Sequence, residues 1–148
     1  MKKYLIIALL CLAVILALLQ ADKKSAVEIA GKMLLVDVAR TDAEKSKGLS
    51  GKDKLNENEG MLFVFEEAGR YPFWMKDMKF PIDIIWLMPA ESGDNSLLTA
   101  VYIERNAKPE SYPNTFNPKV DSKYVLEVVS GLSEKNNLKI GDTIFVEY

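Results

Sequence analysis

Short runs of alternating hydrophobic residues recur along the chain, and this pattern is typical of β-strands. Residues 32–39 (KMLLVDVA) place Leu34, Val36 and Val38 on one face of a strand. In residues 60–65 (GMLFVF), the apolar residues Met61, Phe63 and Phe65 alternate with Leu62 and Val64, so both faces of a strand here would be apolar. That segment therefore predicts a strand that is buried on both faces.

Other segments complete a mainly β pattern with one or two short helices. Further strands are predicted between turn signals, at residues 72–75, 82–88, 97–105, 122–129 and 143–148. Residues 41–48 (TDAEKSKG) predict a helix, with Thr41 and Glu44 as a capping box and Gly48 as the stop. A helix of two turns is unstable alone, so we expect it to rest on the sheet. A helical turn is predicted near residues 130–138.

Seven or eight short strands with turns between them predict a compact β-sandwich or barrel-like domain. We expect this single domain to span residues 32–148, with residues 22–31 as a linker. The chain is long enough for one domain with a hydrophobic core.

Residues 1–21 have the pattern of a signal peptide or a membrane anchor. Lys2 and Lys3 precede sixteen uncharged residues, 4–19. This run is long for the apolar part of a signal peptide and short for a transmembrane helix. We expect an N-terminal hydrophobic helix that is either cleaved or kept in the membrane. The rest of the protein would then be extracytoplasmic, as a membrane-anchored or secreted domain.

The composition narrows the chemistry that is open to the protein. The chain has no histidine, and its single cysteine, Cys11, lies in the apolar N-terminal run. These facts exclude Ser-His-Asp and Cys-His nucleophiles, and zinc sites built from histidine and cysteine clusters. We expect no metal and no other cofactor. The net charge is −2 and the sixteen lysines are scattered, so no basic stripe indicates a nucleic-acid partner.

A carboxylate interrupts the most apolar segment of the chain, YPFWMKDMKFPIDIIWL (71–87). In the predicted strand, Asp83 shares a face with Ile85 and Leu87, while Trp86 points the other way. A buried, unpaired carboxylate costs several kcal/mol, so Asp83 requires a cation or several hydrogen-bond donors. The candidates are Lys76, Lys79, Arg40 and the backbone N–H groups of residues 77–80.

Three interpretations of this segment are open. In the first, Asp83 is a structural clamp that holds the preceding loop against the sheet, with Pro81 setting the direction of the chain. In the second, the segment forms an apolar cleft with a few polar groups. The candidate ligand-binding residues are Phe73, Trp74, Met75, Lys76, Asp77 and Asp83. In the third, Asp77 and Asp83 are a catalytic pair. We expect Trp74 to be partly exposed at the rim of a cleft and Trp86 to be buried.

Several segments, in this order along the chain, resemble the family called domain of unknown function 192. They are VDVARTDAEKSKGLSGKDKL, GMLFVF, FWMKDMKFPIDIIWL, YVLEVVSG and KIGD, and they cover about residues 33–148. The resemblance implies a compact β-sandwich-like domain that is common in exported proteins, and it implies no activity. The family usually has asparagine at Asp77, threonine at Met78 and an Arg-Gly-Leu-Met-like segment at residues 47–50. Binding through those positions would therefore be altered here.

These observations favour a non-enzymatic β domain that is exported or tethered to the membrane through residues 4–19. It would bind an unknown small molecule, peptide or envelope protein. The first alternative is a histidine-free hydrolase or lyase that uses Asp77 and Asp83. The second alternative is a structural module of an envelope complex. An apolar cleft beside Trp74 would favour the binding role. A water-filled cleft that contains both carboxylates would favour catalysis, and a flat exposed apolar patch would favour a structural module.

Overall fold

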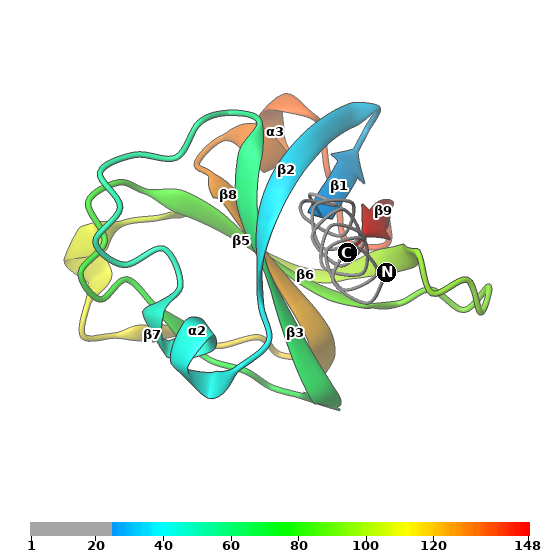
Figure 1. The fold of residues 1–148 in the computed structure, drawn as a ribbon, viewed down its shortest axis with the longest axis horizontal. Helices are drawn as coiled ribbons and strands as arrows, with labels where there is room; N and C mark the ends of the chain where they lie inside the picture. Colours follow the sequence, from blue (N-terminus) through cyan, green and yellow to red (C-terminus); the bar gives the residue numbers. More distant parts are fainter. Residues whose placement is uncertain (1–24) are drawn as a thin grey trace, which may run out of the picture.

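The computed structural model of the protein describes residues 25–148. They form a closed barrel with the strand order β1–β2–β3–β8–β5–β6–β9, and a separate two-stranded sheet of β4 and β7 (Figure 1). The strands are β1 (Ser25–Ile29), β2 (Lys32–Ala39), β3 (Glu59–Gly69), β4 (Phe73–Trp74), β5 (Ile82–Pro89), β6 (Leu97–Ala107), β7 (Thr115–Phe116), β8 (Ser122–Val129) and β9 (Thr143–Glu147).

The predicted mainly β fold is confirmed, and its architecture is a barrel rather than the sandwich that the family resemblance implied. The helices are α2 (Asp42–Lys47) and α3 (Leu132–Lys135), with a 3-10 helix, η1 (Pro109–Ser111). β2 and β3 are parallel, and α2 lies in the connection between them. The hydrophobic helix expected within residues 1–21 lies outside the described residues.

β1 closes the barrel, and its presence corrects the expectation of a linker over residues 22–31. Ser25–Ile29 pair with both β2 and β9 in antiparallel registers. Val27 and Ile29 are fully buried. Residues 30–31 both have positive φ, as a two-residue hairpin turn requires. The turn sequence Ala-Gly is a weaker signal than Asn-Gly, and β1 is short, so the sequence pattern does not reveal this strand.

Two hydrophobic cores lie on opposite faces of β3, β8 and β5. The inner core receives residues from all seven barrel strands and therefore fills the barrel. The outer core lies on the other face of the same strands. In β5, Ile85 and Leu87 belong to the inner core, while Ile84 and Trp86 belong to the outer one. The predicted alternation of β5, and the burial of both faces of β3, are confirmed.

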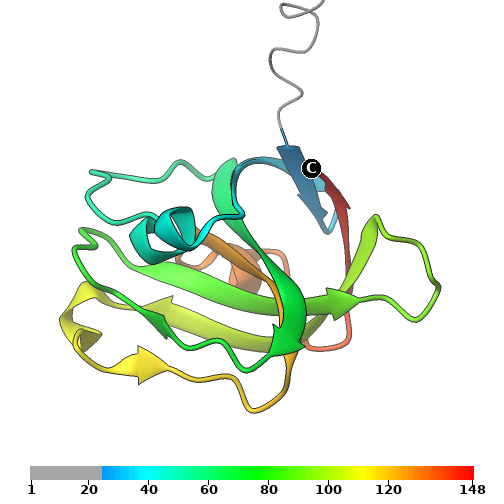
Figure 2. The same cartoon turned by 60° about the horizontal axis from the view of Figure 1, so that its bottom comes forward.

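The outer core is covered mainly by loops and by the two-stranded sheet of β4 and β7, rather than by a large second sheet or a long helix. The connections at 48–58, 75–81 and 108–121 all extend to the side of the barrel that is opposite β1 and β9 (Figure 1, Figure 2). From these loops, Leu49, Leu55 and Met75 are buried in the outer core. The capping box of α2 is present as predicted, but α2 itself buries no side chain.

Asp83 links β5 to α3 at one end of the barrel. It is fully buried. Its Oδ1 accepts hydrogen bonds from the backbone N–H groups of Asn106 (2.9 Å) and Gly131 (3.2 Å). Its Oδ2 accepts from the backbone N–H (3.0 Å) and the hydroxyl (2.6 Å) of Ser133. The N-cap of α3, Gly131, has no side chain of its own to cap the helix, so Asp83 takes that role, and its negative charge suits a helix N-terminus.

The partners of Asp83 differ from those that the sequence suggested. None of Lys76, Lys79, Arg40 or the 77–80 turn donates to it; the donors come from the end of β6 and from α3. The bonds therefore fix α3 rather than the loop before Pro81. Alternation along a strand gives the face on which a side chain lies, but not the distant segment that packs across from it.

Replacing Asp83 with alanine should lower the free energy of unfolding by about 3–5 kcal/mol, because the buried donors would lose their acceptor. Urea unfolding followed by circular dichroism measures this change. Glu91→Ala, at an exposed turn position, is the matched control and should unfold as the wild type does. An Asp83→Ala protein with the wild-type midpoint would contradict the role assigned to this carboxylate.

Candidate functional site

A pocket of about 290 Å³ lies on the outer face of β3 and β8, beside α2 and β4. We call it the aromatic pocket because five rings line it, those of Phe63, Phe65, Tyr71, Phe73 and Trp74. The rest of its lining comes from Lys45, Ser46, Lys47, Gly48, Leu49, Ser50, Pro72, Met78, Thr115 and Glu127. A cavity of about 150 Å³ lined by apolar residues can hold benzene, so this pocket has room for a single-ring molecule with a short side chain.

The aromatic walls are held by contacts among themselves and with the outer core. Phe63 and Phe73 meet edge to face, with ring centroids 4.9 Å apart. Phe65 and Tyr71 are stacked, with centroids 3.6 Å apart. The indole N–H of Trp86 donates to the backbone carbonyl of Tyr71 at 3.0 Å. The pocket therefore has walls whose positions are set before any ligand arrives.

Glu127 is the one acidic residue in the lining of the aromatic pocket. It lies on β8, between Met61 of β3 and Ile84 of β5, and only 4% of it is exposed. Its Oε2 is buried and has no hydrogen-bond partner among residues 25–148. Buried polar atoms almost always have a partner, so this oxygen is an unusual one: an acceptor, or a donor when protonated, with no partner in residues 25–148.

Burial raises the pKa of Glu127 from its ordinary value of 4.5 to about 8. The cause is the loss of water around the carboxylate, with no cation or hydrogen-bond donor to offset it. At neutral pH the free protein therefore holds Glu127 mainly in the protonated form. A carboxyl with a strongly shifted pKa in a pocket marks a candidate functional site.

The turn after α2 passes directly over Glu127. Gly48 has a φ of 49° and a ψ of −135°, a conformation that favours glycine. A Cβ at Gly48 would lie 3.3 Å from the ring of Phe63 and 3.8 Å from Oε2 of Glu127. The side chain of any larger residue would therefore enter the inner end of the pocket. This contact is a second reason for glycine at position 48, in addition to its role in ending the helix.

Hydrogen bonds join this turn to the loop after β4. The hydroxyl of Ser50 donates to the carbonyl of Lys76 at 2.7 Å, and the N–H of Gly51 donates to the carbonyl of Asp77 at 2.9 Å. An exposed ion pair between Lys79 and Asp53 (2.6 Å) lies between the same two loops, although such pairs add little stability. The two loops thus form one covering over the outer core.

Two lysines of α2 lie at the outer end of the aromatic pocket. Lys45 is half-buried and Lys47 is exposed. The Nζ atom of Lys45 lies 4.8 Å from the centroid of the Phe65 ring, within the range of a cation–π interaction. The pocket therefore has positive charge at its mouth and an uncharged acid at its inner end.

The structure brings only part of the predicted ligand-binding set together. Phe73 and Trp74 line the aromatic pocket. Met75 is buried beneath the loop in the outer core. Lys76 and Asp77 have exposed side chains and act through their carbonyl oxygens.

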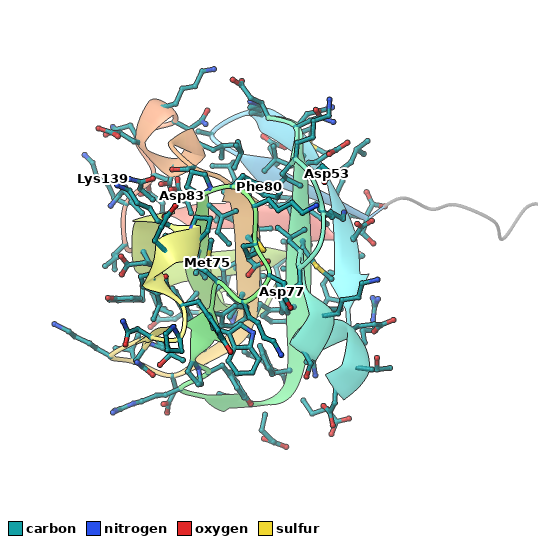
Figure 3. The ribbon with its side chains drawn as sticks, turned by 90° about the vertical axis from the view of Figure 1, so that its left-hand side faces the viewer. Asp53, Met75, Asp77, Phe80, Asp83 and Lys139 are labelled. Atoms are coloured by element: carbon teal, nitrogen blue, oxygen red, sulfur yellow. The ribbon has the colours of Figure 1, made fainter. Side chains whose placement is uncertain are left out.

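Asp83 lies apart from Asp77, toward α3 (Figure 3). Neither carboxylate lines the aromatic pocket, so the geometry gives no support to a catalytic Asp77–Asp83 pair. Pro81 is exposed, and its carbonyl accepts a hydrogen bond from the N–H of Ser130 at 3.3 Å. That bond holds the end of the loop against the connection that follows β8.

Sequence reasoning missed Glu127, which is the residue that distinguishes this pocket. The run SKYVLEVV predicts a strand with Glu127 on the face shared by Val125 and Val129. The usable signal was an acid in a strand whose other residues are nearly all apolar, the same signal that drew attention to Asp83. Sequence alone does not show that the face of Glu127 is covered, because the covering loops begin about 50 and 80 residues earlier in the chain.

Two further findings concern the described part of the chain. In residues 25–148, no group of three or more histidine, cysteine, aspartate or glutamate side chains is placed to hold a metal ion. Over the same residues, no helix is long and apolar enough to cross a membrane.

The fold and the site together define a closed β-barrel domain with an aromatic pocket on its outer face and an unpaired acid in that pocket. Over residues 25–146 the sequence matches the family of uncharacterized ACR proteins, DUF192. The chain therefore belongs to this family, and the resemblance noted from its sequence motifs is confirmed.

Two solved structures are similar to this protein. One, from Sinorhizobium meliloti 1021 and described as a proposed transcription regulator, is 24% identical, covers 83% of this chain and 92% of its own, and has a TM-score of 0.71. The other, a protein of unknown function from Novosphingobium aromaticivorans DSM 12444, is 28% identical, covers 84% of each chain, and has a TM-score of 0.70. No curated protein shows significant similarity to the chain.

The exposure of the two tryptophans agrees with the sequence prediction and gives a test of the pocket. Trp74 is 47% exposed and Trp86 is fully buried. Iodide should therefore quench the emission of Trp74 and leave that of Trp86 nearly unchanged. Wild type and Trp74→Phe are compared in the same titration, and the variant should lose most of the quenchable emission. Equal quenching of both proteins would show that Trp74 is inaccessible in solution.

The raised pKa of Glu127 predicts a pH-dependent stability. Because the folded state holds this proton more tightly than the unfolded chain, the contribution of Glu127 is fully present below pH 4.5 and is lost as the pH rises through about 8. Glu127→Gln should remove that loss. The difference in unfolding free energy between variant and wild type should change by up to about 1.4 kcal/mol per pH unit in this window. Urea unfolding of both proteins at several pH values measures this change. If the difference in unfolding free energy does not depend on pH, the raised pKa of Glu127 is contradicted.

Proposed function

We propose that this domain binds a small, largely apolar molecule in the aromatic pocket, with Glu127 as its polar contact. The observation that carries the proposal is the acid Glu127, which lines the pocket and whose buried Oε2 has no partner in residues 25–148. A ligand group that hydrogen-bonds to this oxygen would relieve the penalty of an unsatisfied buried polar atom. Ring stacking against the aromatic walls would supply the apolar part of the affinity.

The shape and composition of the site support binding rather than a structural role. Ligand pockets are mostly apolar, with few polar groups that set the orientation of the ligand. The aromatic pocket combines five rings with one acid. Three of the positions at which this chain differs from the usual residues of its family, Lys47, Ser50 and Met78, also line the pocket. Ligand preference is therefore expected to vary within the family.

We further propose that the domain works outside the cytoplasm, tethered to the membrane or secreted. The support is the N-terminal sequence, in which Lys2 and Lys3 precede the uncharged run 4–19. The small molecule would then reach the pocket from the cell envelope or its surroundings. Transcription regulation, the role proposed for the Sinorhizobium protein, has no support in this chain, because its charge is −2 and no basic stripe is present in its sequence.

Filling the pocket with a side chain should abolish binding of small aromatic molecules. Ser46 is exposed, on α2, and lines the pocket. Ser46→Trp should weaken binding of benzyl alcohol by at least about tenfold, because the indole would take the space of the ligand. Ser46→Ala is the matched control and should bind as the wild type does. Saturation-transfer NMR measures binding, and equal binding by all three proteins would place the ligand outside this pocket.

A further inference from the structure

We propose that the group recognised by the aromatic pocket is a protonated amine on a short aromatic or aliphatic stem, with its N–H groups directed at Oε2 of Glu127. This inference rests on the proposed function, since it names the ligand class of the same pocket. It depends on three features of the site: an acceptor that has no donor among the described residues, aromatic faces that attract cations, and the readiness with which Glu127 can become charged.

The first feature is the shortage of donors around Glu127. Among the polar side chains of the lining, the hydroxyl of Ser50 already donates to the carbonyl of Lys76. No described residue donates to Oε2. A ligand that completes the site therefore brings a donor, and a charged donor gives a shorter and stronger hydrogen bond to a carboxylate than a neutral one.

The second feature is the aromatic lining. The face of an aromatic ring attracts cations, and the attraction grows when water is excluded. The protein already demonstrates this at the mouth of the pocket, where the ammonium of Lys45 lies 4.8 Å from the centroid of Phe65. Deeper in the pocket, Phe63 and Phe73 border the region of Glu127 without a cation of their own. An ammonium there would meet both a carboxylate and aromatic rings.

The third feature is the readiness with which Glu127 can become charged. Because the pKa of Glu127 is about 8, this acid must give up its proton at neutral pH before it can pair with an ammonium. That step lowers the affinity by about tenfold. The ion pair must offset that penalty and the cost of removing water from the ammonium, and the contacts of the ammonium with the aromatic faces add to its stabilisation. On binding, the amine arrives as the ammonium ion, the proton of Glu127 passes to solvent, and the carboxylate pairs with the ligand.

The other titratable groups facing Glu127 are few. α2 contributes Lys45 and Lys47, the segment before β4 contributes Tyr71, and the lining from β3, β4, β7 and the loop after β4 contributes none. Both lysines oppose a second cation, and Lys45 also competes for the face of Phe65. Removing the charge of Lys45 should therefore tighten the binding of an amine. An anionic ligand would respond in the opposite direction.

Isothermal titration calorimetry of the full chain in lipid nanodiscs tests the inference with three probes of one size: benzylamine, benzyl alcohol and benzoate. Benzylamine should bind most tightly, and its affinity should rise by about tenfold or more from pH 6 to pH 8 as Glu127 becomes easier to ionise. Repeating the titration in buffers of different ionisation enthalpy should show close to one proton released at the lower pH.

Two variants of the same chain separate the contribution of Glu127 to amine binding from that of Lys45. Glu127→Gln should weaken benzylamine by at least about tenfold and remove its pH dependence. It should weaken benzyl alcohol less, because the glutamine amide can still hydrogen-bond to a neutral hydroxyl but cannot pair with an ammonium. Lys45→Met should strengthen benzylamine and weaken benzoate. Circular dichroism checks that both variants are folded, and a larger loss for benzylamine than for benzyl alcohol shows that the pocket itself is intact.

The outcomes distinguish this inference from the proposed function. If benzyl alcohol or benzoate binds more tightly than benzylamine, the amine assignment is overturned. If Ser46→Trp abolishes that binding, the pocket is still the binding site. Benzylamine binding that is unchanged by Glu127→Gln would overturn it too, because the acid would not be its partner. Failure of all three probes to bind would overturn both the amine assignment and the proposed pocket.

Discussion

The central strands β3, β8 and β5 are buried on both faces, and most other features of the structure follow from this constraint. Any polar side chain on them must find a partner inside the protein or remain unsatisfied. Two carboxyl groups occupy such positions on neighbouring strands: Asp83 on the inner face and Glu127 on the outer face. Asp83 accepts from four donors, whereas Oε2 of Glu127 has none among the described residues. One acid therefore fixes α3 to the barrel, and the other is the contact that we propose for a ligand.

The covering of the outer face explains why a pocket forms at Glu127. Loops, the short helix α2 and the two-residue strands β4 and β7 lie over this part of the barrel, and they leave gaps that longer regular elements would close. Gly48 keeps the covering turn close to the acid without filling the space above it. The result is a site with a rigid inner wall of strands and an outer wall that two hydrogen-bonded loops provide, an arrangement typical of binding sites.

Much of the fold could be predicted from local sequence patterns. The alternation of 32–39 and 122–129 predicted β2 and β8, and Thr41 with Glu44 predicted the start of α2. These features depend on neighbours along the chain. β1 was missed because a five-residue strand gains its stability from pairing with β2 and β9, and pairing with β9 joins opposite ends of the described chain. The apolar block around Trp74 supplies two residues of the pocket lining, Phe73 and Trp74, and one residue of the outer core, Met75.

The sequence by itself determined the strand-rich pattern, the alternating faces of β2, β5 and β8, the helix cap and the chemical limits set by a chain without histidine. Only the tertiary structure decided that the sheet closes into a barrel, that Asp83 caps α3, and that Oε2 of Glu127 has no partner among residues 25–148. The physical reason is that periodicity records which way a side chain points, whereas the state of a buried carboxyl depends on the atoms that surround it. Those atoms come from segments far apart in the sequence, and they meet only when the barrel is closed and its loops are in place.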